Sequence, residues 1–147
     1  MFAQAALKLT GPMDHLRLVW QTGETMLESV AFDDDPESAR YNILLALQEM
    51  VTNVLRHGYH RDESKPVEVV FGLREDLLSI ELRDQGPAFD PLEYQTDDDE
   101  FDEGMPTECG GHGIRIARAI MDRVEYVREG EWNVLRMFKF ARVIANA

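Results

Sequence analysis

Three polar side chains, Glu49, Asn53 and His57, recur every four residues in the otherwise apolar segment LALQEMVTNVLRHGY, residues 45–59. Four-residue spacing places side chains on one face of a helix. The segment therefore predicts a helix that offers a carboxylate, an amide oxygen and an imidazole along a single stripe. The alternative interpretation is a solvated stripe beside a core helix, and this segment alone leaves both open.

A second chemically informative residue, Asp84, ends the alternating run LLSIELRD, residues 77–84. Because side chains alternate between the two faces of a strand, the carboxylate shares a face with the leucine and isoleucine residues before it and points toward the apolar core. A buried carboxylate needs a hydrogen-bond partner. Asp84 is therefore a candidate ligand-binding group, and the alternative is that it only caps the turn at Gln85-Gly86.

A glycine-rich run, Gly110-Gly111-His112-Gly113-Ile114, precedes a predicted helix. Glycines free the backbone N–H groups at a helix N-terminus, which attracts anionic phosphate. The chain has no GxxxxGK[ST] motif, so the run does not indicate a P-loop. Each of these segments is weakly specific alone, and their order and spacing carry more information than any one of them.

Two helices should precede Asp84 in the chain. Asp14 is expected to cap the first, whose Leu16 and Trp20 recur at helical spacing and should pack on the sheet. Asp35-Pro36 is a start signal for the second, which should continue to about His57.

Hydrophobic periodicity and turn signals predict the remaining elements. The expected order is β-α-α-β-β-α-β-β, which indicates an α+β fold, a two-layer sandwich with helices on one face of a largely antiparallel, mixed sheet. The strands are predicted at 5–10, 67–73, 77–84, 124–128 and 134–140, and the last helix from Gly113.

Composition narrows the class of protein. The chain has 147 residues, 44% of them apolar, which suits one domain. Its 28 acidic and 15 basic residues give a formal charge of −13, which argues against a direct nucleic-acid binder. The single cysteine, Cys109, excludes an internal disulfide and a cysteine-based zinc site. Without a signal-peptide pattern or a run of about 18 apolar residues, a soluble cytoplasmic protein with no membrane segment is expected.

The stretch between Arg83 and Arg115 contains no lysine or arginine, whereas residues 93–108 include eight acidic side chains. With its glycine and proline, this stretch is expected to be a mobile acidic loop, and residues 97–103 would meet a basic protein partner. A solvated loop without a role is the alternative.

The segments EMVTNVLRHGY at 49–59, DQGPAFDP at 84–91 and GGHGIRIARAIMDRVEY at 110–126 resemble, in this order, the N, G1 and G2 boxes of the GHKL ATP-binding superfamily. That superfamily has the Bergerat fold. With NVLRMFK at 133–139, the resemblance extends over nearly the whole chain and is strongest toward single-domain anti-sigma-factor serine kinases of bacterial partner-switching systems. It implies one GHKL domain over residues 1–147.

The resemblance implies a role for each candidate residue. Asp84 would accept the exocyclic amine of a purine, and Gly86 would let the backbone approach the base. Asn53 would be the protein ligand of Mg²⁺, and Glu49 would polarise the attacking hydroxyl. His57 would either contact phosphate or cap its helix. The remaining nucleotide-binding residues would be Gly110, Gly111, His112, Gly113 and Ile114.

The same resemblance implies ATP and Mg²⁺ as cofactors, phosphorylation of a serine on an anti-sigma-factor antagonist, alternative binding to a sigma factor, and a homodimer. Relatives commonly bring positive charge over the γ-phosphate, whereas the acidic loop has none, which favours nucleotide binding over efficient phosphoryl transfer. Relatives can also offer a threonine hydroxyl to the purine from the last strand, where Asn133 could substitute.

An alternative from another class is a non-catalytic GHKL module that sequesters a basic protein partner through the acidic loop. Intact Glu49 and Asn53 favour the kinase, and the cation-free loop favours the module. A histidine-kinase catalytic domain and a two-domain ATPase of the gyrase or mismatch-repair kind are not expected, because the sequence contains neither a phosphoacceptor helix pair nor a transducer domain.

Overall fold

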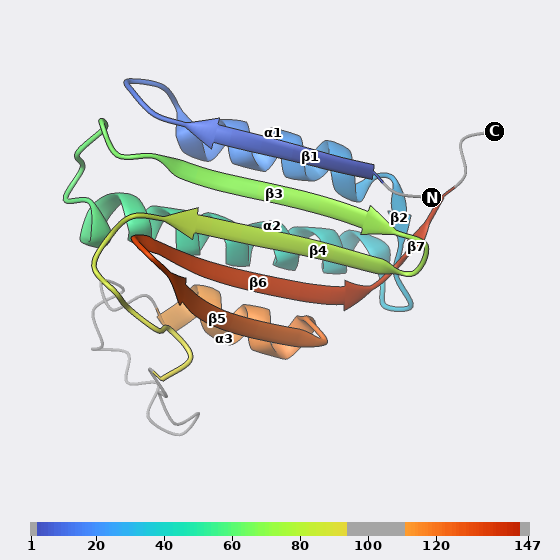
Figure 1. Ribbon diagram of the computed structural model, residues 1–147. Helices are drawn as coiled ribbons and strands as arrows, with labels where there is room; N and C mark the ends of the chain where they lie inside the picture. Colours follow the sequence, from blue (N-terminus) through green and yellow to red (C-terminus); the bar gives the residue numbers. More distant parts are fainter. Residues whose placement is uncertain (1–2, 94–110, 145–147) are drawn as a thin grey trace.

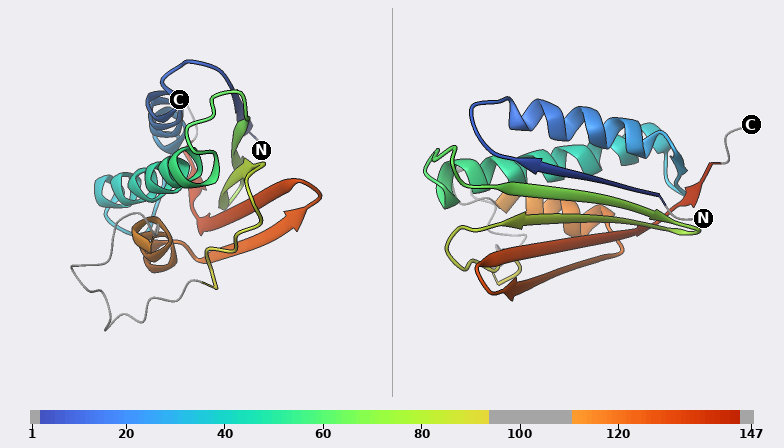
Figure 2. Two further views of the ribbon diagram at one scale, coloured as in Figure 1. Left: turned by 90° about the vertical axis from the view of Figure 1, so that its left-hand side faces the viewer. Right: turned by 45° about the horizontal axis from the view of Figure 1, so that its top comes forward.

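The computed structural model describes residues 3–93 and 111–144, which form an antiparallel sheet with helices covering one of its faces (Figures 1 and 2). The expectations for the acidic loop at 97–103 and for Gly110 lie outside the described residues. Within the described ranges, the predicted α+β architecture with helices on one face of the sheet is confirmed.

Over the described residues the main sheet has five strands in the order β1-β3-β4-β6-β5, and every neighbouring pair is antiparallel. The strands predicted at 67–73 and 77–84, and those predicted at 124–128 and 134–140, pair as two antiparallel hairpins. The strands of this sheet are β1 (Ala3–Leu9), β3 (Val67–Arg74), β4 (Leu77–Asp84), β5 (Arg123–Glu129) and β6 (Trp132–Phe140).

A small second sheet pairs β2 (Val30–Ala31) with β7 (Arg142–Val143). The sequence did not predict these strands, because a two-residue strand is too short to show an alternating pattern. They tie the connection between the first two helices to the C-terminal end of the described chain (Figure 1).

The first helix, α1 (His15–Leu27), begins as predicted, since Asp14 Oδ1 accepts a hydrogen bond of 3.1 Å from the Arg17 backbone N–H. The predicted face is confirmed, because Leu16 and Trp20 pack against the buried core residues. Val19 is buried, whereas Trp20 is only partly buried and its indole N–H donates to Glu24 Oε2 at 3.1 Å. The hydrogen bond keeps the polar edge of the indole at the helix surface, where it can stay near water.

The second helix, α2 (Pro36–Asn53), continues into a π-helical turn, η1 (Val54–Gly58). The backbone N–H of Tyr59 donates to the carbonyl of Val54 at 2.8 Å and closes the wide turn. The sequence predicted one regular helix to about His57. The structure instead ends the regular α-helix at Asn53 and places His57 in the π-turn, which holds more residues per turn than an α-helix.

The third helix, α3 (Gly111–Ile120), begins two residues before the predicted start at Gly113 and packs along α2. A Cβ atom at Gly113 would lie 3.0 Å from both the Ala46 carbonyl oxygen and Glu49 Cβ. Only glycine lets the two helices approach this closely. The N-terminal turn of α3 is therefore held directly beside Glu49.

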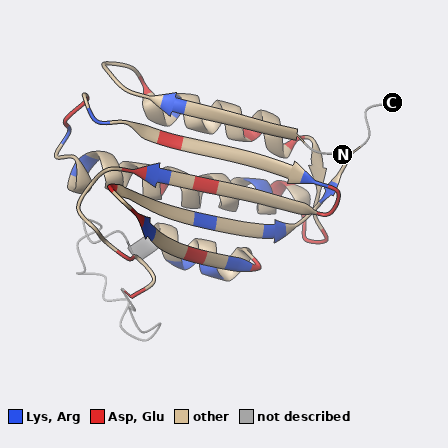
Figure 3. Cartoon of the chain, viewed as in Figure 1, with Lys and Arg blue, Asp and Glu red and all other residues tan. Residues whose placement is uncertain are grey.

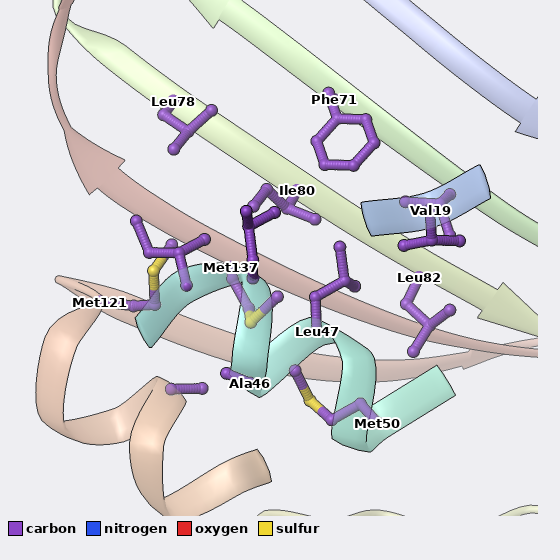
Figure 4. Close-up of a cluster of buried hydrophobic side chains, with 14 of the residues drawn as sticks. Val19, Ala46, Leu47, Met50, Phe71, Leu78, Ile80, Leu82, Met121 and Met137 are labelled. Atoms are coloured by element: carbon purple, nitrogen blue, oxygen red, sulfur yellow. The ribbon is translucent and has the colours of Figure 1, made fainter. Parts of the chain in front are cut away.

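The core lies between the helices and the sheet (Figure 4). Phe71, Ile80 and Leu47 are completely buried there, and strands β3 and β4 bury alternate residues as predicted. Acidic and basic residues occupy neighbouring strands of the sheet (Figure 3), and those that alternate with the buried residues of β4 lie on the face opposite the core. On that face Arg136 pairs with Glu81 at 2.8 Å.

Replacing Ile80 by alanine should lower the free energy of unfolding by about 2 to 5 kcal/mol, because Ile80 is fully buried on the central strand. Ser79→Ala, one residue earlier on the opposite face, should change it by less than about 0.5 kcal/mol. Urea unfolding with an unchanged m-value is the measurement. Equal effects of the two substitutions would contradict this description of the core.

Candidate functional site

A cavity of about 420 Å³ opens where β4 ends, between the π-turn and strands β5 and β6. Its wall is mostly apolar, with a few polar side chains, which is typical of small-molecule sites. The lining residues are Met50, Asn53, Val54, His57, Gly58, Leu82, Asp84, Pro87, Ala88, Phe89, Pro91, Ile114, Tyr126, Asn133 and Leu135.

Asp84 is the buried carboxylate of this cavity, with 8% of its surface exposed. Among the described residues, the backbone N–H of Gly86 at 2.8 Å and Asn133 Nδ2 at 3.0 Å donate to its Oδ1, and no hydrogen bond reaches Oδ2. Burial raises the pKa of Asp84, and the hydrogen bonds from Asn133 and Gly86 oppose that rise. One carboxylate oxygen is therefore held by protein donors, and the other accepts no hydrogen bond from the residues that the structure describes.

Gly86 sits where a side chain would not fit. A Cβ at this position would lie 3.0 Å from Asp84 Oδ1 and 3.5 Å from Gly58 Cα. The segment after β4 can therefore pass close to the end of the π-turn, and the carboxylate can accept the Gly86 N–H. The close approach seen here is between two protein segments, and the expected role of Gly86 toward a purine base stays a prediction.

Tyr59 connects the π-turn to the segment that follows Asp84. Its side chain is buried, its hydroxyl donates to the Pro66 carbonyl, and the same oxygen accepts the Gln85 backbone N–H at 2.6 Å. Burial raises the pKa of Tyr59 to about 12, so the phenol stays neutral and can donate. Sequence reasoning did not find this residue, because nothing local distinguishes it from a core tyrosine.

Asn133 lies opposite Asp84 in the pairing of β4 with β6. Besides Asp84, its Nδ2 donates to the carbonyls of Gly86 at 3.3 Å and Pro87 at 3.0 Å. The amide nitrogen is thus engaged with protein acceptors. The expectation that Asn133 could stand in for a hydroxyl that contacts a purine gains no support from this geometry, whereas a role in holding Asp84 does.

The structure separates the predicted polar stripe of α2. Asn53 and His57 line the cavity, whereas Glu49 is outside the lining and lies against the first turn of α3. His57 is exposed and faces the cavity from the π-turn. The cavity therefore brings together Asn53, His57 and Asp84, and Glu49 is one turn away.

The structure describes only part of the glycine-rich run at residues 110–114. Gly111 is the first residue of α3, Gly113 is buried in the contact with α2, and Ile114 lines the cavity. His112 lies within α3, but its side chain is outside the described part, as is all of Gly110. The helix N-terminus is thus at the site, as the phosphate-binding expectation requires.

Over residues 3–93 and 111–144, no group of three or more histidine, cysteine, aspartate or glutamate side chains is arranged to hold a metal ion. This does not conflict with a magnesium site of the expected kind, because Mg²⁺ uses few protein ligands together with nucleotide phosphates. Within the same ranges, no helix is both long and apolar enough to cross a bilayer.

A helix-covered antiparallel sheet with a buried carboxylate, a helix N-terminus and an apolar cavity at one end is the arrangement of a nucleotide-binding ATPase domain. The model of the histidine kinase-like ATPase domain family matches residues 13–139, and the chain belongs to this family. The resemblance to GHKL proteins with the Bergerat fold is confirmed.

Two curated relatives are serine-protein kinases. The chain is 30% identical to RsbW of Oceanobacillus iheyensis over 87 residues, which are 57% of this chain and 55% of that relative. It is 25% identical to RsbW of Bacillus cereus strain Q1 over 138 residues, which are 91% of this chain and 83% of that relative. The match therefore spans about half of the first relative and most of the second.

Among solved structures, the chain is similar to the RsbU and RsbW domains of Rv1364c from Mycobacterium tuberculosis. The TM-score is 0.63 at 16% sequence identity, over 99% of this chain and 34% of that chain. This likeness shows a shared fold.

Asp84→Asn should weaken ATP binding by roughly tenfold or more. The new amide can present a donor to the purine amine, which leaves the amine without an acceptor, and an unsatisfied buried group of this kind costs about 1 to 3 kcal/mol of binding free energy. Calorimetry of ATP binding is the measurement, and unchanged affinity would contradict the assignment of Asp84.

The same variant should keep the stability of the ligand-free protein. Because the pKa of Asp84 is raised in the folded state, its ionised form destabilises the fold above that pKa, and this cost is relieved as the pH falls through it. Asp84→Asn should therefore melt at the same temperature as the parent or higher at neutral pH. A large loss of stability would show that Asp84 serves the fold rather than a ligand.

Proposed function

We propose that this chain binds ATP with Mg²⁺ in the cavity at the end of β4 and acts as an anti-sigma factor with protein-serine kinase activity toward an anti-sigma-factor antagonist. The observation that carries the proposal is the Asp84 carboxylate, which is buried in the cavity wall and accepts protein hydrogen bonds at Oδ1. An ionised carboxylate in this position is an acceptor for the exocyclic amine of adenine.

The rest of the cavity suits the other parts of ATP. Its apolar wall, which includes Leu82, Ile114 and Leu135, can sandwich a flat base. The N-terminal turn of α3 lies at the same cavity and favours phosphate, because its backbone N–H groups and the helix dipole attract anions.

Asn53 would hold Mg²⁺ from the wall of the cavity, and the bound ion would neutralise charge on the phosphate oxygens. Glu49, against the first turn of α3, lies one helical turn before Asn53. From there its carboxylate would accept the proton of a substrate serine hydroxyl. His57 faces the cavity, so of its alternative roles a phosphate contact suits this position better than a cap.

The partners are proposed from the resemblance of the sequence to anti-sigma-factor kinases and from similarity to serine-protein kinase RsbW over 91% of the chain. On this basis the chain would act as a single GHKL domain in the cytoplasm, pair as a homodimer, and bind a sigma factor and an antagonist protein in alternation. Its charge of −13 gives it little attraction for nucleic acid.

The second candidate is a non-catalytic GHKL module that sequesters a protein partner. The observation in its favour is the absence of lysine and arginine between Arg83 and Arg115, where kinases of this kind commonly have positive charge near the γ-phosphate. The module would bind its partner without phosphorylating it. The two candidates can be separated in two steps. Partner proteins are first captured from the encoding organism with and without ATP, and each captured partner is then tested in a phosphoryl-transfer assay.

Glu49→Gln should bind magnesium-ATP within about threefold of the parent but transfer phosphate to a captured antagonist at least about 100-fold more slowly, because it removes the base that acts on the incoming hydroxyl. Asn53→Ala should weaken ATP binding in Mg²⁺ and have little effect in EDTA.

Glu37→Gln, an acidic residue in the first turn of the same helix and remote from the cavity lining, is the matched control and should leave both measurements unchanged. Transfer by Glu49→Gln at the parent rate would assign Glu49 a structural role. Antagonist binding without transfer by the parent would favour the non-catalytic module.

A further inference from the structure

Asp84, Asn133 and Arg128 form one row across three neighbouring strands. Asp84 of β4 is opposite Asn133 of β6, and Asn133 is opposite Arg128 of β5. Directly opposed residues point to the same face of a sheet, so these side chains can contact one another in sequence. Arg128 is the outermost member of the row and is not part of the cavity lining.

The guanidinium of Arg128 is fixed by several acceptors. Its Nη1 donates to the Gly86 carbonyl at 2.8 Å and to Asn133 Oδ1 at 3.1 Å, and its Nε donates to the Gly130 carbonyl at 3.0 Å. The side chain thus crosses from β5 to the segment that follows β4. It holds both that segment and the amide of Asn133.

Arg128 helps to fix which way the Asn133 amide faces, in the same sense as the Gly86 and Pro87 carbonyls, which accept hydrogen bonds from Asn133 Nδ2. A guanidinium can only donate, so the amide must turn its oxygen toward Arg128 and its nitrogen toward Asp84. Tyr126 also donates to Asn133 Oδ1, but a hydroxyl could accept instead and would tolerate either orientation. The Phe89 backbone N–H reaches the same oxygen only at 3.4 Å. If the amide turned over, its oxygen would face the Asp84 carboxylate.

We propose that Arg128 is a positioning residue for base recognition: by fixing the Asn133 amide, it keeps Asp84 Oδ1 occupied by the protein and presents Oδ2 to the amine of an adenine base. This inference rests on the proposed function, since it concerns how the same cavity selects its nucleotide. It goes further by assigning selectivity to a residue outside the cavity wall.

The consequence is a specific effect on base discrimination. Inosine triphosphate has a carbonyl where ATP has the exocyclic amine, so at that position it offers the carboxylate an acceptor instead of a donor. A variant that only loosens the site would weaken the binding of both nucleotides. A variant that releases the Asn133 amide should weaken the binding of ATP alone. Burial raises the pKa of Asp84 and the Arg128 charge offsets part of that rise, which also favours the ionised acceptor.

The test compares the parent with Arg128→Met, Arg128→Lys and Arg123→Met. Arg128→Met removes every donor while keeping an unbranched side chain, and Arg128→Lys restores a group that can only donate. Arg123 is the matched control, because it lies on the same strand, is 72% exposed and pairs with Glu125 at 3.0 Å away from the cavity. Arg123→Met changes the net charge of the protein by the same amount as Arg128→Met.

Binding of ATP and inosine triphosphate, each with Mg²⁺, is measured by calorimetry. Arg128→Met should lose about tenfold in ATP affinity and less than about twofold in inosine triphosphate affinity, so the ratio of the two affinities falls by about five- to tenfold. Arg128→Lys should restore most of the parent's ratio of ATP affinity to inosine triphosphate affinity. Arg123→Met should bind both nucleotides with the affinities of the parent. An unchanged ratio in Arg128→Met, or an equal loss for both nucleotides, would overturn the proposal.

A second measurement needs no nucleotide. In the ¹H–¹⁵N spectrum of the ligand-free protein, the side-chain NH₂ pair of Asn133, assigned by its absence in Asn133→Asp, should exchange slowly with water in the parent and rapidly in Arg128→Met. Equal exchange would overturn the positioning role. A parent that binds neither nucleotide would overturn the proposed function and the selectivity claim together, whereas discrimination retained in Arg128→Met would overturn only the latter.

Discussion

A carboxylate in the protein interior destabilises the fold unless it accepts hydrogen bonds. Asp84, at the end of β4, is such a carboxylate, and the groups around it must supply the donors. Neighbouring groups satisfy Oδ1 through the Gly86 N–H and the Asn133 amide. Burial still raises the pKa of Asp84. The ionised carboxylate therefore lowers the stability of the ligand-free protein, and a hydrogen-bond donor on the proposed ligand would relieve this cost.

The secondary structure around Asp84 brings separate segments of the chain close together at the cavity. The π-turn brings Gly58 next to Gly86, and the Tyr59 hydroxyl accepts the Gln85 N–H, so α2 and β4 are linked at the cavity. On the other side, Gly113 lets the first turn of α3 rest on α2 beside Glu49. The group proposed to act on a substrate and the helix end proposed to meet phosphate are thus brought together by one close helix contact.

Much of this arrangement could be predicted from local pattern. Period-two alternation placed Asp84 on the buried face, and capping signals located α1 and α2. The sequence could not show the π-turn, because its extra residue leaves no mark on composition, so a regular helix was predicted to continue to about His57. Nor could it reveal the link from Arg128 through Asn133 to Asp84, since that depends on the register of three strands.

The central claim is that the cavity at Asp84 is an ATP site. A titration of the ¹⁵N-labelled protein with magnesium-ATP, followed by backbone amide shifts, tests it most directly. The account predicts saturable shifts centred on Gly86 and Ile114, and none at Val30 or Val143, which lie in the small β2–β7 sheet outside the cavity lining. Shifts confined to the β2–β7 pair, or no shifts at millimolar ATP, would contradict it.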